Sequence, residues 1–123
     1  MKKLLLGCFF AVMCTGLFAG ANEETMFNDF VKGARENLQS QGGGGTVCAD
    51  RVHRIVYLAI PVSANKSEFT PEKIRQAKAI MIRPVKNDRD AVQVFKTLKL
   101  RIVATYITTD HDIVTISYSY KDL

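Results

Sequence analysis

The sequence predicts an α+β domain in which an N-terminal helix packs on a small antiparallel sheet that ends in a C-terminal β-hairpin. Three observations support this fold class. Residues 23–40 carry apolar side chains at helical spacing, residues 52–62 are rich in β-branched and aromatic side chains, and two more β-rich runs flank Asp110-His111-Asp112. A helix signal followed by several strand signals indicates that the helix is buried against the sheet.

Residues 1–21 have the pattern of a cleaved export signal. Two lysines open the chain, an almost uniformly apolar run covers residues 4–18, and Ala19-Gly20-Ala21 supplies the small residues that signal peptidase requires. The apolar run is shorter than the roughly 20 residues of a bilayer-spanning helix, so no stable membrane anchor is expected after cleavage. The sequence therefore predicts a mature chain that begins near Asn22 in a periplasmic or secreted protein, with a start typical of bacteria.

The predicted mature chain has about 100 residues, enough for one domain with a modest core. Its net charge is about +3 rather than the +5 of the whole chain, because two lysines leave with the signal. The basic residues are spread along the sequence and interleaved with acidic or apolar positions. Binding to a nucleic-acid backbone needs a basic cluster, so no nucleic-acid partner is expected.

Residues 23–40 are predicted to form an amphipathic helix. Asn22 suits the N-cap position, and the two glutamates that follow suit the positive end of the helix dipole. The apolar residues that share one face of this helix are Phe27, Phe30, Val31, Ala34 and Leu38.

Four consecutive glycines, Gly42 to Gly45, follow this helix, and no glycine occurs after Gly45. A phosphate-binding loop has spaced glycines between a strand and a helix, followed by Gly-Lys-Ser/Thr, and none of these features is present. We interpret residues 42–45 as a Gly-rich linker between the helix and the rest of a single domain that spans residues 22–123.

The middle of the chain predicts a strand and one clear helix start. Residues 52–62 are expected to form a strand that is buried on both faces, with a buried helix as the alternative. Thr70 and Pro71 then suit the N-cap and first position of a helix that continues through Ile74, Ala77 and Met81.

Two segments fit either a helix or a strand: residues 79–85, which Pro84 is expected to end, and residues 90–99. If both are strands, the layout becomes one helix followed by a meander. That element order is similar in outline to cystatin-like or NTF2-like domains.

The C-terminal runs predict a hairpin around Asp110-His111-Asp112. The register is open between two pairings, in which either Ile107 or Thr108 lies opposite Val114. The side chains expected on one face of the last strand are Val114, Ile116, Tyr118 and Tyr120, and those expected on the other are Thr115, Ser117, Ser119 and Lys121.

Cys48 is the single cysteine of the predicted mature chain, because the other two leave with the signal. Three states are open to it: buried and inert, paired with a second copy in a homodimer, or reactive. As a nucleophile it would need a base, either His53 or His111, with Asp110 or Asp112 orienting the imidazole. The catalytic candidates are therefore Cys48, His111 and Asp112.

Asp110-His111-Asp112 also resembles a metal-binding triplet. Neighbouring side chains of a strand point to opposite faces, and hydrogen bonds to nearby amides explain aspartates in a turn. The predicted mature chain holds two histidines and one cysteine, too few for a convincing zinc site. Neither a metal nor another cofactor is predicted.

Tyr118 and Tyr120 alternate with serines on the last predicted strand, a composition that suits a recognition surface, although the alternation favours an ordinary sheet face beneath the helix. They are the candidate binding residues. Because no family signature surrounds Cys48, the sequence favours a small exported, non-catalytic protein that binds a protein partner. The alternative is a cysteine-dependent hydrolase or transferase that uses Cys48 with His111.

Overall fold

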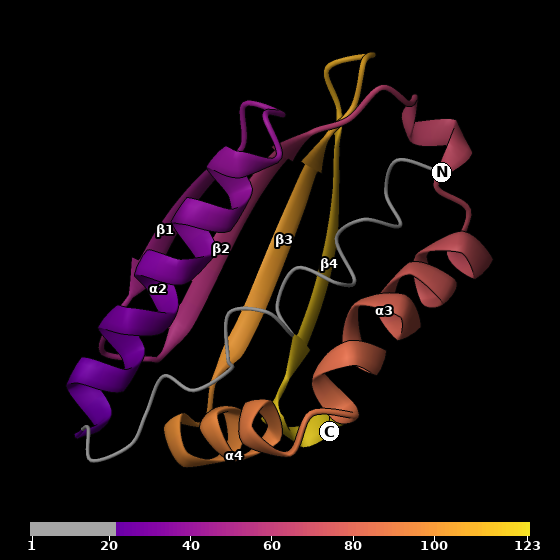
Figure 1. The fold of residues 1–123 in the computed structure, drawn as a ribbon. Helices are drawn as coiled ribbons and strands as arrows, with labels where there is room; N and C mark the ends of the chain where they lie inside the picture. Colours follow the sequence, from indigo (N-terminus) through magenta and orange to yellow (C-terminus); the bar gives the residue numbers. More distant parts are fainter. Residues whose placement is uncertain (1–21) are drawn as a thin grey trace.

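The computed structural model describes residues 22–123, so the predicted export signal over residues 1–21 lies outside the described residues. It confirms the α+β class, with helices on one side of a four-stranded sheet of order β1-β2-β3-β4 (Figure 1). In chain order the elements are α2 (Glu23–Ser40), β1 (Thr46–Asp50), β2 (Ile55–Pro61), the 3-10 helix η2 (Lys66–Glu68), α3 (Pro71–Lys86), α4 (Arg89–Leu98), β3 (Arg101–Ile107), β4 (Ile113–Ser119) and the 3-10 helix η3 (Tyr120–Asp122).

The sheet is mixed, which corrects the expectation of a wholly antiparallel sheet. β1 and β2 form one antiparallel pair and β3 and β4 another, but β2 and β3 run parallel in the centre. The reason lies in residues 79–85 and 90–98, which are helical and belong to α3 and α4. The two helices carry the chain back to the end where β2 began, as a parallel pair requires. The alternative meander, similar to cystatin-like or NTF2-like domains, is therefore wrong.

The helix α2 forms as predicted. The side chain of Asn22 accepts a hydrogen bond from the Thr25 amide at 2.8 Å, which satisfies one of the free N–H groups at the helix start. Its buried residues are the five that the sequence placed on one face. Figure 1 shows α2 alongside β1 and β2, α3 on the side of β4, and α4 across the end of the sheet near the C-terminus.

The helix α3 begins as predicted, because Thr70 accepts a hydrogen bond from the Lys73 amide at 3.3 Å and Pro71 follows it. Pro84 does not end this helix, contrary to expectation. Proline removes one backbone donor, but the last turn still closes through the Asn87 amide, which donates to the Arg83 carbonyl at 3.0 Å. The helix therefore continues to Lys86.

Phe95 of α4 joins three elements at the centre of the core. Its ring meets Phe30 of α2 edge to face, with centroids 5.7 Å apart, and stacks on Tyr118 of β4 at 5.8 Å. All three side chains are at most 2% exposed. The core thus lies between the helices and one face of the sheet.

The C-terminal hairpin forms, but with neither of the expected registers. Ile107 pairs with Ile113 across a loop of residues 108–112. Val114, Ile116 and Tyr118 are buried on one face as predicted, while Thr115 and Ser117 are exposed on the other. The residues that follow Ser119 leave the strand and form η3.

Candidate binding site

One face of the sheet bears no helix of the described chain, and we call it the open face. Alternate residues of each strand lie on it, and the register places Cys48, Tyr57, Val103 and Ser117 in one row. Its exposed apolar side chains include Tyr57 at 41%, Ile107 at 40% and Ile113 at 55%. We define the apolar patch as the following side chains of the open face: Tyr57, Ala59, Pro61, Val103, Ile107 and Ile113.

The apolar patch was missed by the sequence analysis because of β2. Residues 52–62 were expected to be buried on both faces, which is wrong: residues 52–54 form a turn, and β2 is buried on one face only. An unbroken apolar run does not show which of its faces is covered. The strand β1 was also missed, because Val47 is its only buried residue.

Cys48 is exposed on the open face, so the buried and inert state is not the one observed. Ser117 of β4 ends its row, about 14 Å away across three strand spacings. His111 lies in the hairpin loop beyond Ile113, and Ile113 is itself about 13 Å from Ser117 along β4. A nucleophile and its base must lie within hydrogen-bond distance. The structure therefore does not bring Cys48 and His111 together.

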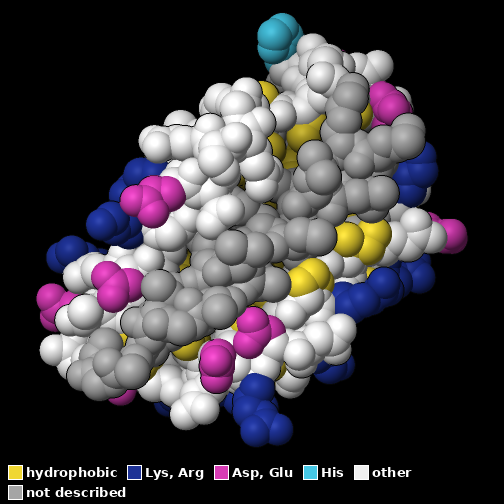
Figure 2. All heavy atoms as spheres, viewed as in Figure 1, with side chains coloured by type: hydrophobic (Ala, Val, Ile, Leu, Met, Phe, Trp, Pro, Cys, Tyr) yellow, Lys and Arg dark blue, Asp and Glu magenta, His cyan; other side chains and the backbone are white. Residues whose placement is uncertain are grey.

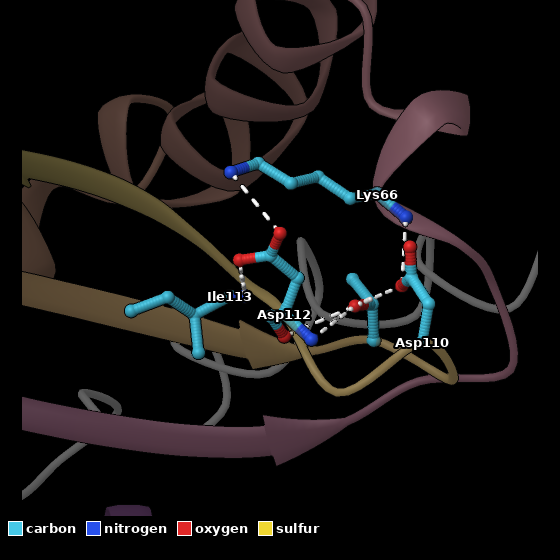
Figure 3. Close-up of polar contacts among 5 residues, drawn as sticks. Lys66, Asp110, Asp112 and Ile113 are labelled. Carbon is cyan, nitrogen blue, oxygen red and sulfur yellow. Dashed lines mark hydrogen bonds and ion pairs between the residues drawn. The ribbon is translucent and has the colours of Figure 1, made fainter.

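Asp110 and Asp112 are engaged in the hairpin loop (Figure 3). The carboxylate of Asp112 accepts a hydrogen bond from the Ile113 amide at 2.9 Å and lies 3.4 Å from the Lys66 ammonium. Asp110 accepts from the Thr108 hydroxyl at 2.5 Å and from the Lys66 amide at 3.2 Å. Both aspartates thus fix the loop against the segment before α3, as the turn interpretation expected.

The other ionisable candidates lie apart from this loop. His53 sits in the turn after β1, where its Nδ1 atom is 2.8 Å from the carboxylate of Asp50. Within residues 22–123, no group of three or more histidine, cysteine, aspartate or glutamate side chains has the arrangement of a metal site.

The two tyrosines proposed for binding differ in position. Tyr118 is 2% exposed beneath α4, so its ring lies in the core rather than at the surface. Tyr120 is half-buried in η3, directly after the end of β4.

The hairpin loop should loosen in acid. The pKa of Asp110 is lowered, first by the hydrogen bond from Thr108 and then by that from the Lys66 amide. A carboxyl group whose folded pKa is below its unfolded value of about 3.9 stabilises the fold above that value, and this contribution is lost as the pH falls through the folded pKa. We expect Asp110→Asn to flatten part of the fall in melting temperature below about pH 4.

Thr108→Val provides the matched variant, since it removes the donor and keeps the carboxylate. It should flatten the same part of the profile when thermal melts are recorded across the acid range. A profile identical to that of the unmodified protein in both variants would contradict this assignment.

Comparison with known proteins finds that no family model, no curated protein and no solved structure matches the chain. None of the helices formed by residues 22–123 combines the length and apolar character of a membrane span.

Proposed function

We propose that this chain is a small exported, non-catalytic protein that binds a partner protein through the open face of its sheet. The observation that carries the proposal is the apolar patch, where Tyr57, Ile107 and Ile113 are each at least 40% exposed on a face that no described helix covers. Contiguous exposed apolar side chains commonly mark sites of protein interaction, and tyrosine is enriched in such interfaces. Export is supported by the signal-like pattern of residues 1–21.

Cys48 provides a natural probe of this face. It is exposed and lies directly opposite Tyr57 in the β1–β2 register. A benzophenone maleimide attached to Cys48 would therefore sit at the edge of the apolar patch. The whole chain is expressed for this experiment. If the protein is exported as proposed, it is recovered from the periplasm or the medium.

We expect irradiation of the labelled protein, in an extract of the compartment that holds it, to give one discrete cross-linked product. The same label on a Cys48→Ser, Gln76→Cys variant should give none, because Gln76 is exposed on α3. Tyr57→Ser should weaken the Cys48 product. A product of twice the monomer mass would identify a second copy as the partner, by way of the homodimer that Cys48 suggests.

Three results would oppose the proposal. Equal cross-linking from positions 48 and 76 would show that capture is not specific to the open face. Absence of any product from Cys48 would show that this face has no partner in the compartment. Recovery of the protein only from the cytoplasm would contradict export.

A further inference from the structure

A basic hollow of about 290 Å³ lies on the open face, at the end of the sheet where β2 and β3 begin and β4 ends. None of the described residues that line it is acidic. We call it the basic hollow and define it by the residues that line it: His53, Ile55, Lys99, Arg101, Ser119, Tyr120 and Lys121. These residues form no cluster in the sequence, because they come from three separate stretches of the chain.

The fold brings these stretches together through the sheet register. Ile55, Arg101 and Ser119 begin β2, begin β3 and end β4, and they lie side by side in one row. This row exists because β2 and β3 are parallel and start at the same end of the sheet. The remaining lining residues occupy the turns and the 3-10 helix that extend beyond this row.

Backbone hydrogen bonds hold the wall of the hollow. Lys99 caps α4 in the left-handed conformation, with φ of 52°. The Arg101 amide then donates to the Arg54 carbonyl at 3.1 Å, and the Tyr120 amide donates to the Leu100 carbonyl at 3.0 Å. The positions of Lys99, Arg101 and Tyr120 are therefore fixed by the ends of the strands and helices and do not depend on a mobile loop.

Asp50 positions the histidine of the hollow. Its carboxylate accepts hydrogen bonds from the amides of Val52 and His53, each at 3.0 Å, and its other oxygen is 2.8 Å from His53 Nδ1. The pKa of Asp50 is lowered, chiefly by the bond from the His53 amide. Asp50 pairs with Ile55 in the same row, and both of its carboxylate oxygens thus contact residues of the turn.

Within the described residues, the lysine and arginine side chains that line the hollow have no acidic partner. No ion pair formed within residues 22–123 includes Lys99, Arg101 or Lys121. Asp122 lies next in the chain to Lys121, but its carboxylate accepts from the Ser119 amide at 2.8 Å and lies 3.8 Å from Lys78 of α3. The ammonium of Lys121 instead lies 6.0 Å from the centre of the Tyr120 ring. Three like charges around one concave surface create a positive potential that an anion would relieve.

We propose that the basic hollow binds a phosphate group carried by a small molecule or a lipid. Arg101 offers the planar fork that pairs with two oxygens of a phosphate, while Lys99 and Lys121 supply point charges. The Ser119 hydroxyl and the His53 ring add polar groups, and Tyr120 and Ile55 provide a wall for the part of the ligand that bears the phosphate. A volume near 290 Å³ suits a small anionic group and is too small for a folded partner.

The test is a titration of the purified ¹⁵N-labelled protein with inorganic pyrophosphate, followed by NMR, with sodium chloride at matched ionic strength as the reference. We expect saturable shifts in the amides of the hollow that chloride does not produce. Arg101→Gln should weaken binding about tenfold or more, because it removes charge-assisted hydrogen bonds. Arg75→Gln on α3 makes the same change in net charge outside the hollow and should leave affinity within about twofold.

The outcomes separate the sources of the phosphate. Co-sedimentation with phosphatidylglycerol vesicles but not with phosphatidylcholine vesicles, reversed by pyrophosphate, would assign the hollow to lipid headgroups. Pyrophosphate binding without co-sedimentation would assign it to soluble phosphates. Equal responses to pyrophosphate and chloride, or equal losses in Arg101→Gln and Arg75→Gln, would overturn the proposal.

This inference stands apart from partner binding through the apolar patch. Tyr57 does not line the hollow, so Tyr57→Ser should leave pyrophosphate affinity unchanged. The helix-covered side of the molecule appears in Figure 2, where lysine and arginine side chains lie along the margins.

Discussion

Phe95→Ala is expected to lower the free energy of unfolding by about 3–5 kcal/mol, the usual cost of deleting a fully buried aromatic ring. Phe95 is 0% exposed, and its ring contacts both Phe30 of α2 and Tyr118 of β4. The substitution therefore leaves a cavity where a helix, a second helix and a strand meet. A domain of this size has about 5–15 kcal/mol of total stability, so the variant should unfold at far lower urea concentration.

Urea unfolding followed by circular dichroism measures this effect. Phe69→Ala is the matched control, because the Phe69 ring stacks on Tyr106 from a partly exposed position outside the centre of the core. It should cost clearly less than Phe95→Ala. Equal losses in the two variants, or a loss below about 1 kcal/mol for Phe95→Ala, would show that the aromatic contacts do not hold the helices on the sheet.

The sequence was most informative where all its signals pointed to the same kind of element. The helix α2 combines a cap at Asn22 with an apolar face that runs from Phe27 to Leu38, and both were identified correctly. The start of α3 at Thr70 was equally clear. The residues 79–85 gave two signals at once, since their apolar run suits a strand while their position continues a helix. The capped start and the packing of Met81 and Val85 decide for the helix.

The hairpin register depended on a contact that spacing does not reveal. Thr108 is 3% exposed, and its hydroxyl accepts from the Asp112 amide at 3.0 Å. The Thr108 amide in turn donates to the Asp112 carbonyl at 2.9 Å. These bonds close a five-residue loop, so Tyr106 rather than Ile107 faces Val114.

The basic hollow could not be found from the sequence for a topological reason. His53, Arg101 and Lys121 are far apart in the sequence, and only the parallel pairing of β2 with β3 brings the start of β3 to the turn between β1 and β2. That pairing could not be predicted, because the residues of α4 fitted either a helix or a strand. Charge spacing along the chain therefore gave no sign of a basic cluster that the fold creates.

The glycines between α2 and β1 differ in what surrounds them. A Cβ atom on Gly45 would lie 2.7 Å from Cδ2 and 2.8 Å from Cγ of Leu38, whose side chain is only 3% exposed. A Cβ atom on Gly43 would meet nothing within 4 Å. Gly42 and Gly44 have positive φ, of 70° and 75°, so alanine would strain the backbone at both positions. Alanine substitutions at Gly43 and Gly45 can therefore be compared to test whether the glycine run is a flexible linker throughout or is packed against α2 at Gly45.

Gly45→Ala is expected to destabilise the fold by about 1–3 kcal/mol, because the added methyl group displaces the buried Leu38 side chain from the end of α2. Gly43→Ala should instead be neutral or stabilise by about 0.4–1 kcal/mol, since it restricts only the unfolded chain. Urea unfolding of the two variants measures the difference. If Gly45→Ala is as stable as Gly43→Ala, the Leu38 side chain can move to make room for the new methyl group. The glycine run would then behave as a linker along its whole length. If the signs differ as expected, the linker ends at Gly44, and Gly45 belongs to the packed contact that holds α2 on the sheet.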